Sequence, residues 1–418
     1  MQTRFDALII GAGPAGASAA ILLATAGWSV GLVEKQAFPR RKVCGECVAA
    51  SNLPLLDALG IGAAFTAQAG PELRRVALLR GAHSALADLP PAAHARHPWG
   101  RALSREILDT LLLERARAAG AVVLQPWAMQ RIGGTAGQHQ CLVREAVSDR
   151  LQVLLAPVVV LAYGSWEPLP EARAAQRLAR SGASLLAFKA TFQGASLQPG
   201  LLPVLAFHGG YGGMVLGDHG LVTLACCIRA DRLEPLRRAL PGCSAGEAVE
   251  AMLRRECHGV ADALHGALRC GAWLASGPLA PGVRLPARQL AFRIGNAAGE
   301  AHPIIGEGMS MALQSAWLLC AGLVQGRANA KYRAGAGPGW QREVHARYQA
   351  EWRRHFVPRM RLASTFAHLA MQPLASAGLL ALLRRWPGLL THAAAWSGKL
   401  HSAADAGTIA ALAPKLWR

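Results

Sequence analysis

The sequence of 418 residues predicts an α/β fold made of three parts. A βαβ-type domain opens the chain, an antiparallel β-sheet domain interrupts it, and a helical region ends it. Three patterns support this fold: an apolar strand leading into a glycine turn and an apolar helix, short apolar runs separated by glycine, and aromatic residues at helical spacing. The expected parts are residues 1–166 and 284–330 for the first domain, 167–283 for the β-rich domain and 331–418 for the helical region.

The first pattern, within residues 6–35, contains a Gly-x-Gly-x-x-Gly turn between a strand and a helix. In such a turn Gly11 permits the sharp bend, Gly13 lets a pyrophosphate approach the backbone, and Gly16 lets the helix pack closely on the strand. Free N–H groups at the helix N-terminus favour the anion. Glu34 ends the next strand, where its carboxylate can accept hydrogen bonds from a ribose. The pattern therefore predicts a Rossmann-like dinucleotide site with these contacts: Gly11, Gly13, Pro14, Ala15, Gly16 and Glu34.

The composition excludes disordered and fibrous classes and limits the possible partners. Hydrophobic residues make up 52% of the chain and charged residues 17%. The net charge of +19, from 44 basic and 25 acidic residues, favours acidic partners or anionic membrane surfaces. No nucleic-acid-binding motif or lysine-rich patch is present, so we expect no nucleic acid partner. The sequence also has no uninterrupted apolar run of about 18 residues, the length that an integral membrane segment needs.

The cysteines bear on the cellular compartment and on metal binding. Nine cysteines at scattered spacings do not resemble a disulfide framework, so we expect a reducing cytoplasm. Cys44 and Cys47 form a Cys-x-x-Cys pair, which alone fits a redox disulfide or half of a zinc site. A zinc site requires a second pair at matching spacing, whereas Cys226 and Cys227 are adjacent. We therefore expect no metal and interpret the first pair as loop residues, with a redox role as the alternative.

The loop after Glu34 is basic and reads Phe-Pro-Arg-Arg-Lys-Val-Cys-Gly-Glu over residues 38–46, so it can lie along the dinucleotide. It resembles the loop after the first βαβ unit in the geranylgeranyl-reductase-like branch of FAD-dependent oxidoreductases. That branch is similar to the p-hydroxybenzoate-hydroxylase class of flavoprotein monooxygenases and to the flavin-dependent halogenases. The resemblance implies that Cys44, Gly45 and Glu46 border the flavin cavity, which makes them candidate catalytic residues. It also implies that Lys35 and Arg41 contact the cofactor.

A helix is predicted over residues 103–119, with Ser104 as its N-cap. Its start matches the family pattern Arg-x-x-Leu-Asp-x-x-Leu, which implies that Arg105 contacts the cofactor. A buried strand is expected at residues 158–162. Family members carry an acid in the Ala-Asp-Gly turn after this strand, whereas this chain has Tyr163, and this departure leaves the role of the turn open.

Short β-type runs separated by glycine follow, which is typical of an antiparallel sheet that covers one face of the flavin. The runs are residues 185–192, 202–207, 214–216 and 221–228. The segment Gly-Tyr-Gly-Gly-Met-Val at 210–215 resembles the Gly-Tyr-x-Trp-x-Phe-Pro strand of the reductase branch, with Gly213 where that branch has tryptophan. The missing indole leaves room above the flavin ring, so the resemblance does not carry over the way those reductases hold a substrate.

A second cofactor signature lies within residues 289–309, where a strand leads into Gly-Asn-Ala-Ala and Pro-x-x-Gly-Glu-Gly opens a helix. The family has Gly-Asp-Ala-Ala here, and Asn296 keeps an acceptor but loses the charge. Backbone N–H groups at residues 306–308 and the helix dipole would face the flavin N1 and C2 carbonyl, which become anionic on reduction. The predicted contacts are Gly295, Asn296, Gly306, Gly308 and Met309, and the predicted catalytic positions are Gly306, Glu307 and Gly308. The two distant signatures together favour FAD over NAD as the bound cofactor.

The remaining chain is basic and aromatic, with apolar residues at helical spacing over residues 340–369 and 374–390. We expect these helices to pack on the β-rich domain. Two alternatives are contact with a membrane surface and a cap over the substrate pocket.

The resemblance implies a FAD-dependent monooxygenase that uses NAD(P)H and O2 on an aromatic or otherwise electron-rich substrate. The alternatives are a reductase of an isoprenoid or polyene double bond, a halogenase, and a non-catalytic flavoprotein. The halogenase is less favoured because the Trp-x-Trp-x-Ile-Pro segment typical of those enzymes is absent. The net charge and Gly213 lead us to expect a large, acidic substrate, either a free small molecule or one bound to a carrier or protein.

Overall fold

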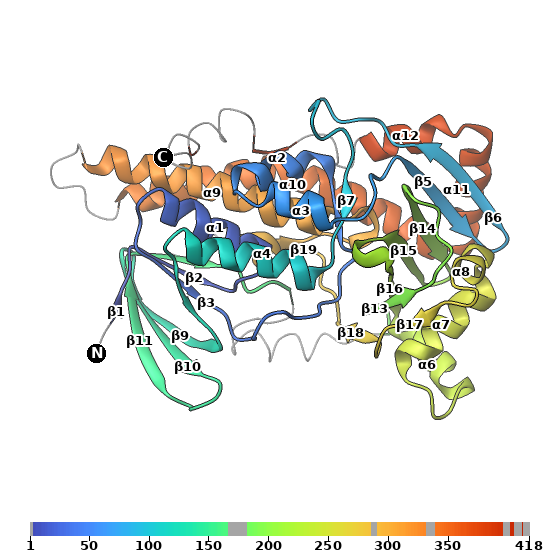
Figure 1. Cartoon of the computed structure of the whole chain (residues 1–418), viewed down its shortest axis with the longest axis horizontal. Coiled ribbons are helices and arrows are strands. Elements are labelled where there is room, and N and C mark those ends of the chain that lie inside the picture. The colour runs from blue at the N-terminus through green and yellow to red at the C-terminus, as the bar shows by residue number, and fades with distance from the viewer. Residues whose placement is uncertain are drawn as a thin grey trace.

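The structure is a computed structural model that describes residues 3–165, 182–285, 291–331, 339–395, 402–404 and 412. It confirms the predicted α/β class, with a parallel sheet, a large mixed sheet and a helical C-terminal region (Figure 1). The boundaries proposed between the parts stay a prediction.

The parallel sheet has five strands in the order β20-β12-β2-β3-β8. These strands are β2 (Ala7–Ile10), β3 (Val30–Val33), β8 (Val122–Leu124), β12 (Val158–Leu161) and β20 (Phe292–Arg293). The apolar residues of β2 and β12 are buried on both faces because helices cover one face and a second sheet covers the other. The covering helices are α1 (Pro14–Thr25), α4 (Arg105–Ala118) and α9 (Glu307–Lys331), which pack against one another above the sheet in Figure 1.

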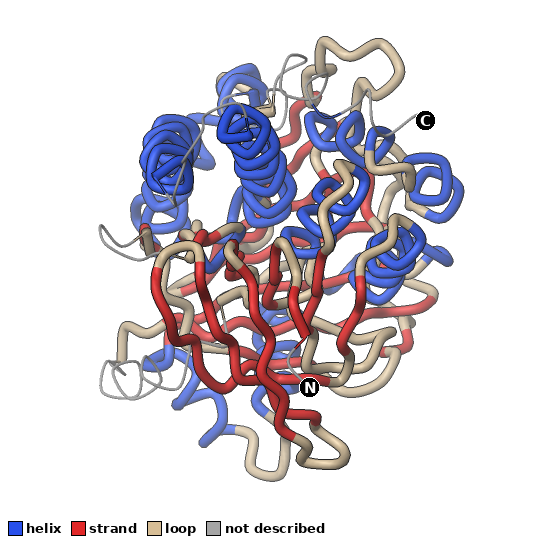
Figure 2. The backbone as a smooth tube through the Cα atoms, turned by 90° about the vertical axis from the view of Figure 1, so that its left-hand side faces the viewer, coloured by secondary structure: helices blue, strands red, loops and turns tan. Residues whose placement is uncertain are grey.

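The other face is covered by a four-stranded sheet that was not predicted from the sequence. Its strands are β1 (Thr3–Arg4), β9 (Trp127–Thr135), β10 (Gln138–Glu145) and β11 (Leu151–Ala156). Phe5, Leu8, Trp127 and Val143 form part of the core between the two sheets. Figure 2 shows a large group of helices above the strands and a smaller group below them.

The large sheet has the order β17-β13-β16-β15-β14-β5-β6, with β18 also pairing with β13. The predicted runs are confirmed as β13 (Leu185–Gln193), β14 (Leu201–Phe207), β15 (Gly210–Leu216) and β16 (Val222–Arg229). Two strands come from the first part of the chain, β5 (Arg75–Arg80) and β6 (His83–Asp88), and β5 pairs with β14 in parallel. The two short strands are β17 (Leu268–Arg269) and β18 (Leu274–Ser276).

One face of the large sheet packs against three helices around Phe188, Phe207, Met214 and Leu253. The helices are α6 (Ala230–Ala239), α7 (Ala245–Glu256) and α8 (His258–Ala263). The opposite face, which carries Tyr211, is directed toward the first domain and the C-terminal helices.

Short elements connect these layers. They are β4 (Cys47–Val48), which pairs with β7 (Arg101–Ala102), β19 (Gly282–Val283), which pairs with β21 (Gly299–Glu300), α2 (Leu53–Ala58), α3 (Gly62–Gln68), and the single-turn helices η1 (Ala50–Asn52), η2 (Asp218–Gly220), η3 (Gly295–Ala297) and η4 (Pro303–Ile305). Ser104 precedes α4 as predicted, but its side chain does not cap the helix. Its backbone N–H instead donates to Asp218 Oδ1 at 2.7 Å, which ties the start of α4 to the large sheet.

The C-terminal helices are α10 (Gly339–Met371), α11 (Pro373–Arg385) and α12 (Gly388–Ala394). Helix α10 packs along α9 and reaches β14 and β15, and α11 packs on β5, β6 and β14. Packing on the β-rich part is therefore confirmed for the described residues. Among those residues no single helix is long and apolar enough to cross a membrane, although α10 and α11 pass that test as a pair bent by 105°.

Candidate functional site

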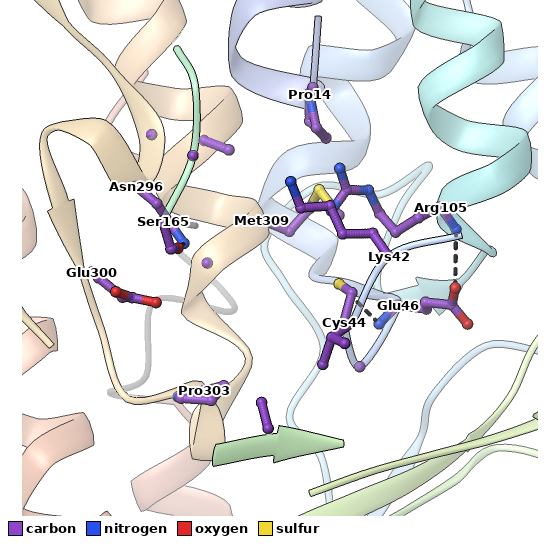
Figure 3. A pocket seen from close by; sticks show the side chains of 18 of the residues that line it. Pro14, Lys42, Cys44, Glu46, Arg105, Ser165, Asn296, Glu300, Pro303 and Met309 are labelled. Atoms are coloured by element: carbon purple, nitrogen blue, oxygen red, sulfur yellow. Dashed lines mark hydrogen bonds between the residues drawn. The ribbon is translucent and has the colours of Figure 1, made fainter. Parts of the chain in front are cut away.

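A continuous cavity of about 420 Å³ lies between the carboxyl end of the parallel sheet and the face of the large sheet that carries Tyr211. Its volume falls in the range of about 300–1,000 Å³ that is usual for small-molecule sites. Figure 3 shows side chains from both cofactor signatures pointing toward it. The predicted residues that line it are Gly11, Gly13, Pro14, Ala15, Glu34, Lys35, Cys44, Gly45, Glu46, Arg105, Gly295, Asn296, Gly306, Gly308 and Met309.

Glycine is required at the three positions of the first turn for different structural reasons. Gly11 has φ +103°, and a Cβ there would lie 2.5 Å from the Ala162 carbonyl oxygen. A Cβ on Gly16 would lie 1.8 Å from the Gly11 carbonyl oxygen, so Gly16 serves helix packing and does not line the cavity. A Cβ on Gly13 would project into the cavity, 3.7 Å from a terminal nitrogen of both Arg40 and Arg105. Of these three glycines, only Gly13 has space beside its Cα that no other backbone atom fills.

Glu34 is buried at the end of β3 and its carboxylate is oriented by three donors. Oε2 accepts the Ala12 N–H at 2.8 Å, and Oε1 accepts the Gln36 N–H at 3.0 Å and Arg40 Nη1 at 3.2 Å. The carboxylate is therefore fixed beside the glycine turn, where ribose hydroxyls of a dinucleotide would donate to its remaining lone pairs.

Of the two adjacent arginines in the basic loop, Arg40 lines the cavity and Arg41 does not. The Arg41 Nε lies 3.8 Å from Glu106 Oε2, outside the cavity. Arg40 contacts Glu34 and Asp109, and its buried Nε has no hydrogen-bond acceptor within the described part of the chain. The Arg40 Nη2 lies 3.7 Å from the position of a Cβ on Gly13, so this terminal nitrogen can donate to an anionic oxygen at the glycine turn.

Arg105 is buried and forms a bidentate ion pair with Asp109. The Nε donates to Asp109 Oδ1 at 2.6 Å and Nη2 donates to Asp109 Oδ2 at 2.7 Å. Burial alone would lower the pKa of Arg105, but the Asp109 carboxylate more than compensates, so the pKa rises above its usual value. Asp109 thus anchors both guanidinium groups, at 3.6 Å from Arg40 Nη2. It was not predicted as a functional residue, although its i, i+4 spacing from Arg105 carried that signal.

These observations fit a bound dinucleotide. The α1 N-terminus, two guanidinium groups and the open Gly13 backbone converge on one point, and the arrangement suits a pyrophosphate. The Glu34 carboxylate lines the same cavity beside the glycine turn. The donor set therefore matches the cofactor expected from the sequence.

The loop that carries Cys44, Gly45 and Glu46 is fixed by the Glu46 carboxylate, which is buried at 4% exposure. Glu46 Oε1 accepts a hydrogen bond from the Arg105 backbone N–H at 3.0 Å and forms an ion pair with Lys189 Nζ. Its Oε2 accepts a hydrogen bond from the Thr223 hydroxyl at 2.6 Å. Glu46 also has φ +59°, so its backbone is held in the left-handed region. These contacts tie the loop to α4 and to two strands of the large sheet. Lys189 and Thr223 were not predicted as site residues.

Cys44 and Cys47 are not joined by a disulfide, and both line the cavity. The Glu46 N–H donates to Cys44 Sγ at 3.3 Å, as Figure 3 shows. The sulfur of Cys44 is thus oriented by the same turn that Glu46 fixes.

At the second signature, Asn296 Nδ2 donates to Ser165 Oγ, and the Gly295 N–H donates to Ser315 Oγ at 2.9 Å. Gly306 has φ +70°, which lets the chain turn sharply into α9. Gly306, Gly308 and Met309 line the cavity, whereas Glu307 is buried away from it, 3.6 Å from Arg359 of α10. The backbone of this turn can therefore face a ligand, but the Glu307 side chain does not.

The cavity has two halves of different character. The half beside the glycine turn carries Lys35, Arg40, Lys42 and Arg105. The half beside the large sheet is lined mainly by apolar and small residues: Ala187, Phe188, Leu202, Pro203, Val204, Tyr211, Gly212, Gly213, Met214, Val215, Ala225, Cys226, Cys227, Leu279, Pro303, Ile304 and Ile305. Its polar side chains among these residues are the Tyr211 hydroxyl and two thiols. The basic groups of the site thus serve the cofactor half.

Comparisons with known proteins agree with this geometry. Residues 4–166 match the FAD binding domain family. A tryptophan 2-halogenase from Chondromyces crocatus is 34% identical over 125 residues, which cover 30% of this chain and 23% of that protein. The chain thus matches less than a quarter of the length of that relative.

Solved structures agree over nearly the whole chain. The myxobacterial chondrochloren halogenase CndH is 16% identical with a TM-score of 0.73, over 99% of this chain and 97% of that chain. PqsL from Pseudomonas aeruginosa, described as a probable FAD-dependent monooxygenase, is 19% identical with a TM-score of 0.68, over 93% of this chain and 100% of that chain. At these identities the likeness shows a shared fold. Residues 4–166 thus match a FAD binding domain, and the chain shares its fold with flavin-dependent halogenases, a probable FAD-dependent monooxygenase and a geranylgeranyl bacteriochlorophyll reductase-like protein.

Proposed function

We propose that the protein is a FAD-dependent monooxygenase that uses NAD(P)H and O2 to hydroxylate an aromatic or otherwise electron-rich substrate. The observation that carries the proposal is the continuity of the cavity from the cofactor turn to the open, glycine-lined face of β15. A ring placed at Gly213 would lie beside the loop of Cys44 and the turn of Gly306 without a tryptophan between them.

In this proposal the chain's own residues bind, orient and enclose. Arg40, Arg105 and the α1 N-terminus hold the pyrophosphate, and Glu34 holds the ribose. When bound, FAD supplies the redox chemistry, accepting a hydride equivalent from NAD(P)H and passing two electrons to oxygen. Overall, NAD(P)H, a proton, O2 and the substrate give NAD(P)+, water and a product in which one C–H has become C–OH.

Helix α10 supports the substrate half of the cavity, because it packs across β14, β15 and η4, whose residues line that half. An apolar substrate half limits the loss of reducing equivalents to side reactions with water and protons. The ion pair of Glu46 with Lys189 keeps the loop of Cys44 at a fixed height above the substrate half.

Two other reactions remain as candidates. Double-bond reduction is favoured by the position of Cys44 in a loop like that of the reductase branch, and Gly213 disfavours it. Halogenation is favoured by the similarity to a tryptophan 2-halogenase over part of the chain. The absence of the Trp-x-Trp-x-Ile-Pro segment from the sequence disfavours it.

Oxygen separates these reactions in a single-turnover experiment. The holoenzyme is reduced without oxygen, mixed with a panel of phenols, indoles and polyenes, and divided into an anaerobic sample and two aerated samples, one with bromide. We expect a product that gains one oxygen atom only after aeration. Gain of two hydrogens in the anaerobic sample would show the reductase instead, and a bromide-dependent brominated product would show the halogenase.

A further inference from the structure

An exposed apolar patch, which we call the end patch, lies on β6, α11 and α12 at the right-hand end of the molecule in Figure 1. It consists of five side chains that are each at least 41% exposed: Leu86, Leu374, Leu382, Trp386 and Leu389. They belong to elements that contact one another, since α11 and α12 both pack on β6. Single exposed apolar side chains are ordinary, whereas a cluster of them on adjoining elements marks an interaction surface.

Helix α11 is apolar on its outer side as well as on the side that packs against the sheet. Its buried side chains are Ser376, Leu380 and Leu383. The opposite side is exposed and carries these residues at helical spacing: Leu374, Gly378, Ala381 and Leu382. A surface helix of a protein in water usually has polar residues on its outer side. The outer side of α11 is therefore suited to an apolar environment.

Hydrogen bonds hold both helices in place. Arg80 of β5 donates from Nε to Ser376 Oγ and from Nη2 to the Pro373 carbonyl, both at 2.9 Å. The Thr391 hydroxyl of α12 donates to the Asp88 carbonyl of β6 at 2.9 Å. The end patch is thus a preformed surface, and its binding to a partner requires little ordering of the chain.

The charges beside the end patch favour an anionic partner. Arg384 and Arg385 end α11 and are exposed, and the Arg385 guanidinium lies 5.6 Å from the centre of the Trp386 ring. The sequence has no aspartate or glutamate from residue 352 to residue 404, and the acid of β6 is Asp88. Tryptophan and arginine beside apolar side chains are typical of segments at a membrane–water boundary, where the ring lies at the headgroups and the cation reaches the phosphates.

We propose that the end patch docks on the surface of an anionic phospholipid bilayer, with its apolar side chains in the lipid and Arg384 and Arg385 at the lipid phosphates. The net charge of +19 attracts the whole chain to such a surface. Packing of α11 on β5 and β6 is compatible with this contact, because the two use opposite sides of the helix. A second copy of the chain fits less well, since pairing two end patches would gather the arginines of both copies at one interface.

The test is flotation of the FAD-loaded full chain with vesicles on a density gradient. The vesicles contain either phosphatidylcholine alone or an equal mixture of phosphatidylcholine and phosphatidylglycerol. We expect the protein to float with the anionic vesicles and to bind the neutral ones much more weakly. Added salt should weaken binding to the anionic vesicles, because it screens the attraction between the arginines and the phosphates.

Two double variants separate the apolar contribution from the electrostatic one. Leu374→Glu with Leu382→Glu should abolish flotation, because carboxylates replace the apolar contacts and repel the anionic surface. Arg384→Gln with Arg385→Gln should weaken binding to the anionic vesicles about thirtyfold, which is the factor expected for two cations near such a surface. Its binding to the neutral vesicles should not change. All four side chains are exposed, so each variant should fold and keep stoichiometric FAD.

Matched controls change the same residue types elsewhere. Leu151→Glu with Leu268→Glu replaces leucines that are 59% and 72% exposed, one on the four-stranded sheet and one on β17, at the opposite edge of the large sheet from β6. Arg4→Gln with Arg131→Gln removes two exposed cations from the four-stranded sheet. Both controls should bind within about twofold of the wild type, because charges far from the membrane are screened.

Three outcomes would overturn the proposal. They are a wild type that floats with neither vesicle, flotation that survives in Leu374→Glu with Leu382→Glu, and equal losses in the end-patch and control variants. Light scattering tests the other occupant. A dimer that the leucine variant converts to a monomer, without vesicle binding by the wild type, would assign the end patch to a second copy. Because no turnover is involved, these results are independent of the proposed reaction.

Discussion

The ion pair between Glu46 and Lys189 should be a major determinant of stability, because both side chains are almost fully buried. In Lys189→Met the apolar stem is retained and the ammonium group is lost. The Glu46 carboxylate then keeps two neutral donors, Thr223 Oγ1 and the Arg105 N–H, but no cation. Breaking a buried pair by removing one partner costs about 3–5 kcal/mol. Since unfolding entropy is about 2.1 cal/mol/K per residue, or about 0.9 kcal/mol/K for this chain, Tm should fall by about 3–6 °C.

Thermal unfolding of the holoenzyme, followed by circular dichroism and by release of flavin fluorescence, measures this change. The double variant Glu46→Gln with Lys189→Met leaves no unpaired charge, so it should lose less than the sum of the two single losses. Glu234→Gln is the control, because its pair with Arg238 is exposed and worth at most about 1 kcal/mol. An unchanged Tm in Lys189→Met, or strict additivity in the double variant, would refute the account of this pair.

Three further outcomes are expected. Gly13→Val should fold but fail to retain FAD, since the valine side chain enters the space expected for the pyrophosphate. Glu34→Arg should lose FAD because a cation replaces the acceptor of the ribose hydroxyls. Equilibrium dialysis measures FAD binding by both variants, and stoichiometric FAD in both would contradict the assigned site. Cys47→Ser should keep both the FAD spectrum and turnover, and loss of turnover alone would indicate a Cys44–Cys47 redox pair. Burial, and then the neighbouring His368, lowers the pKa of His302 to about 4. His302 takes up its proton near pH 6.5 in the unfolded chain but only near pH 4 in the folded chain, so the free energy of unfolding should fall as the pH drops through this window. Urea titrations at several pH values should show that this free energy depends less steeply on pH in His302→Asn.

Features set by local sequence could be predicted. The glycine turn, the strand that ends at Glu34 and the turn at Gly306 follow from short-range backbone requirements. The structure gives Gly11 and Gly306 the positive φ angles that such turns need. Most of the cofactor half was therefore predictable from residues close together in the chain.

Strands with weak or inverted patterns were missed. In β6, alanines at 85 and 87 face the core, whereas Leu86 is 47% exposed, so the apolar alternation does not mark the buried face. Strand β9 is mostly partly exposed and contains consecutive glycines at 133 and 134. Neither pattern distinguishes a strand from an irregular loop.

Long-range pairings were also beyond the sequence. A lysine within the apolar run of β13 signals a buried charge, but nothing identifies Glu46 as its partner. The hydrogen bond between the Tyr211 hydroxyl and His302 Nδ1 joins the large sheet to the turn before α9, and the spacing of the two residues in the chain carries no pattern. Arg40 and Arg41 are equally basic, and only the folded loop decides that Arg40 enters the cavity.

The origin of the oxygen atom in the product tests the central claim most directly. The reduced holoenzyme is mixed with an accepted aromatic substrate under isotopically heavy O2 in ordinary water, and the product mass is measured after one turnover. A monooxygenase should place one heavy oxygen atom in the product, and the yield should follow the amount of reduced FAD. A product without the label, or one that forms equally well without O2, would contradict the proposed reaction.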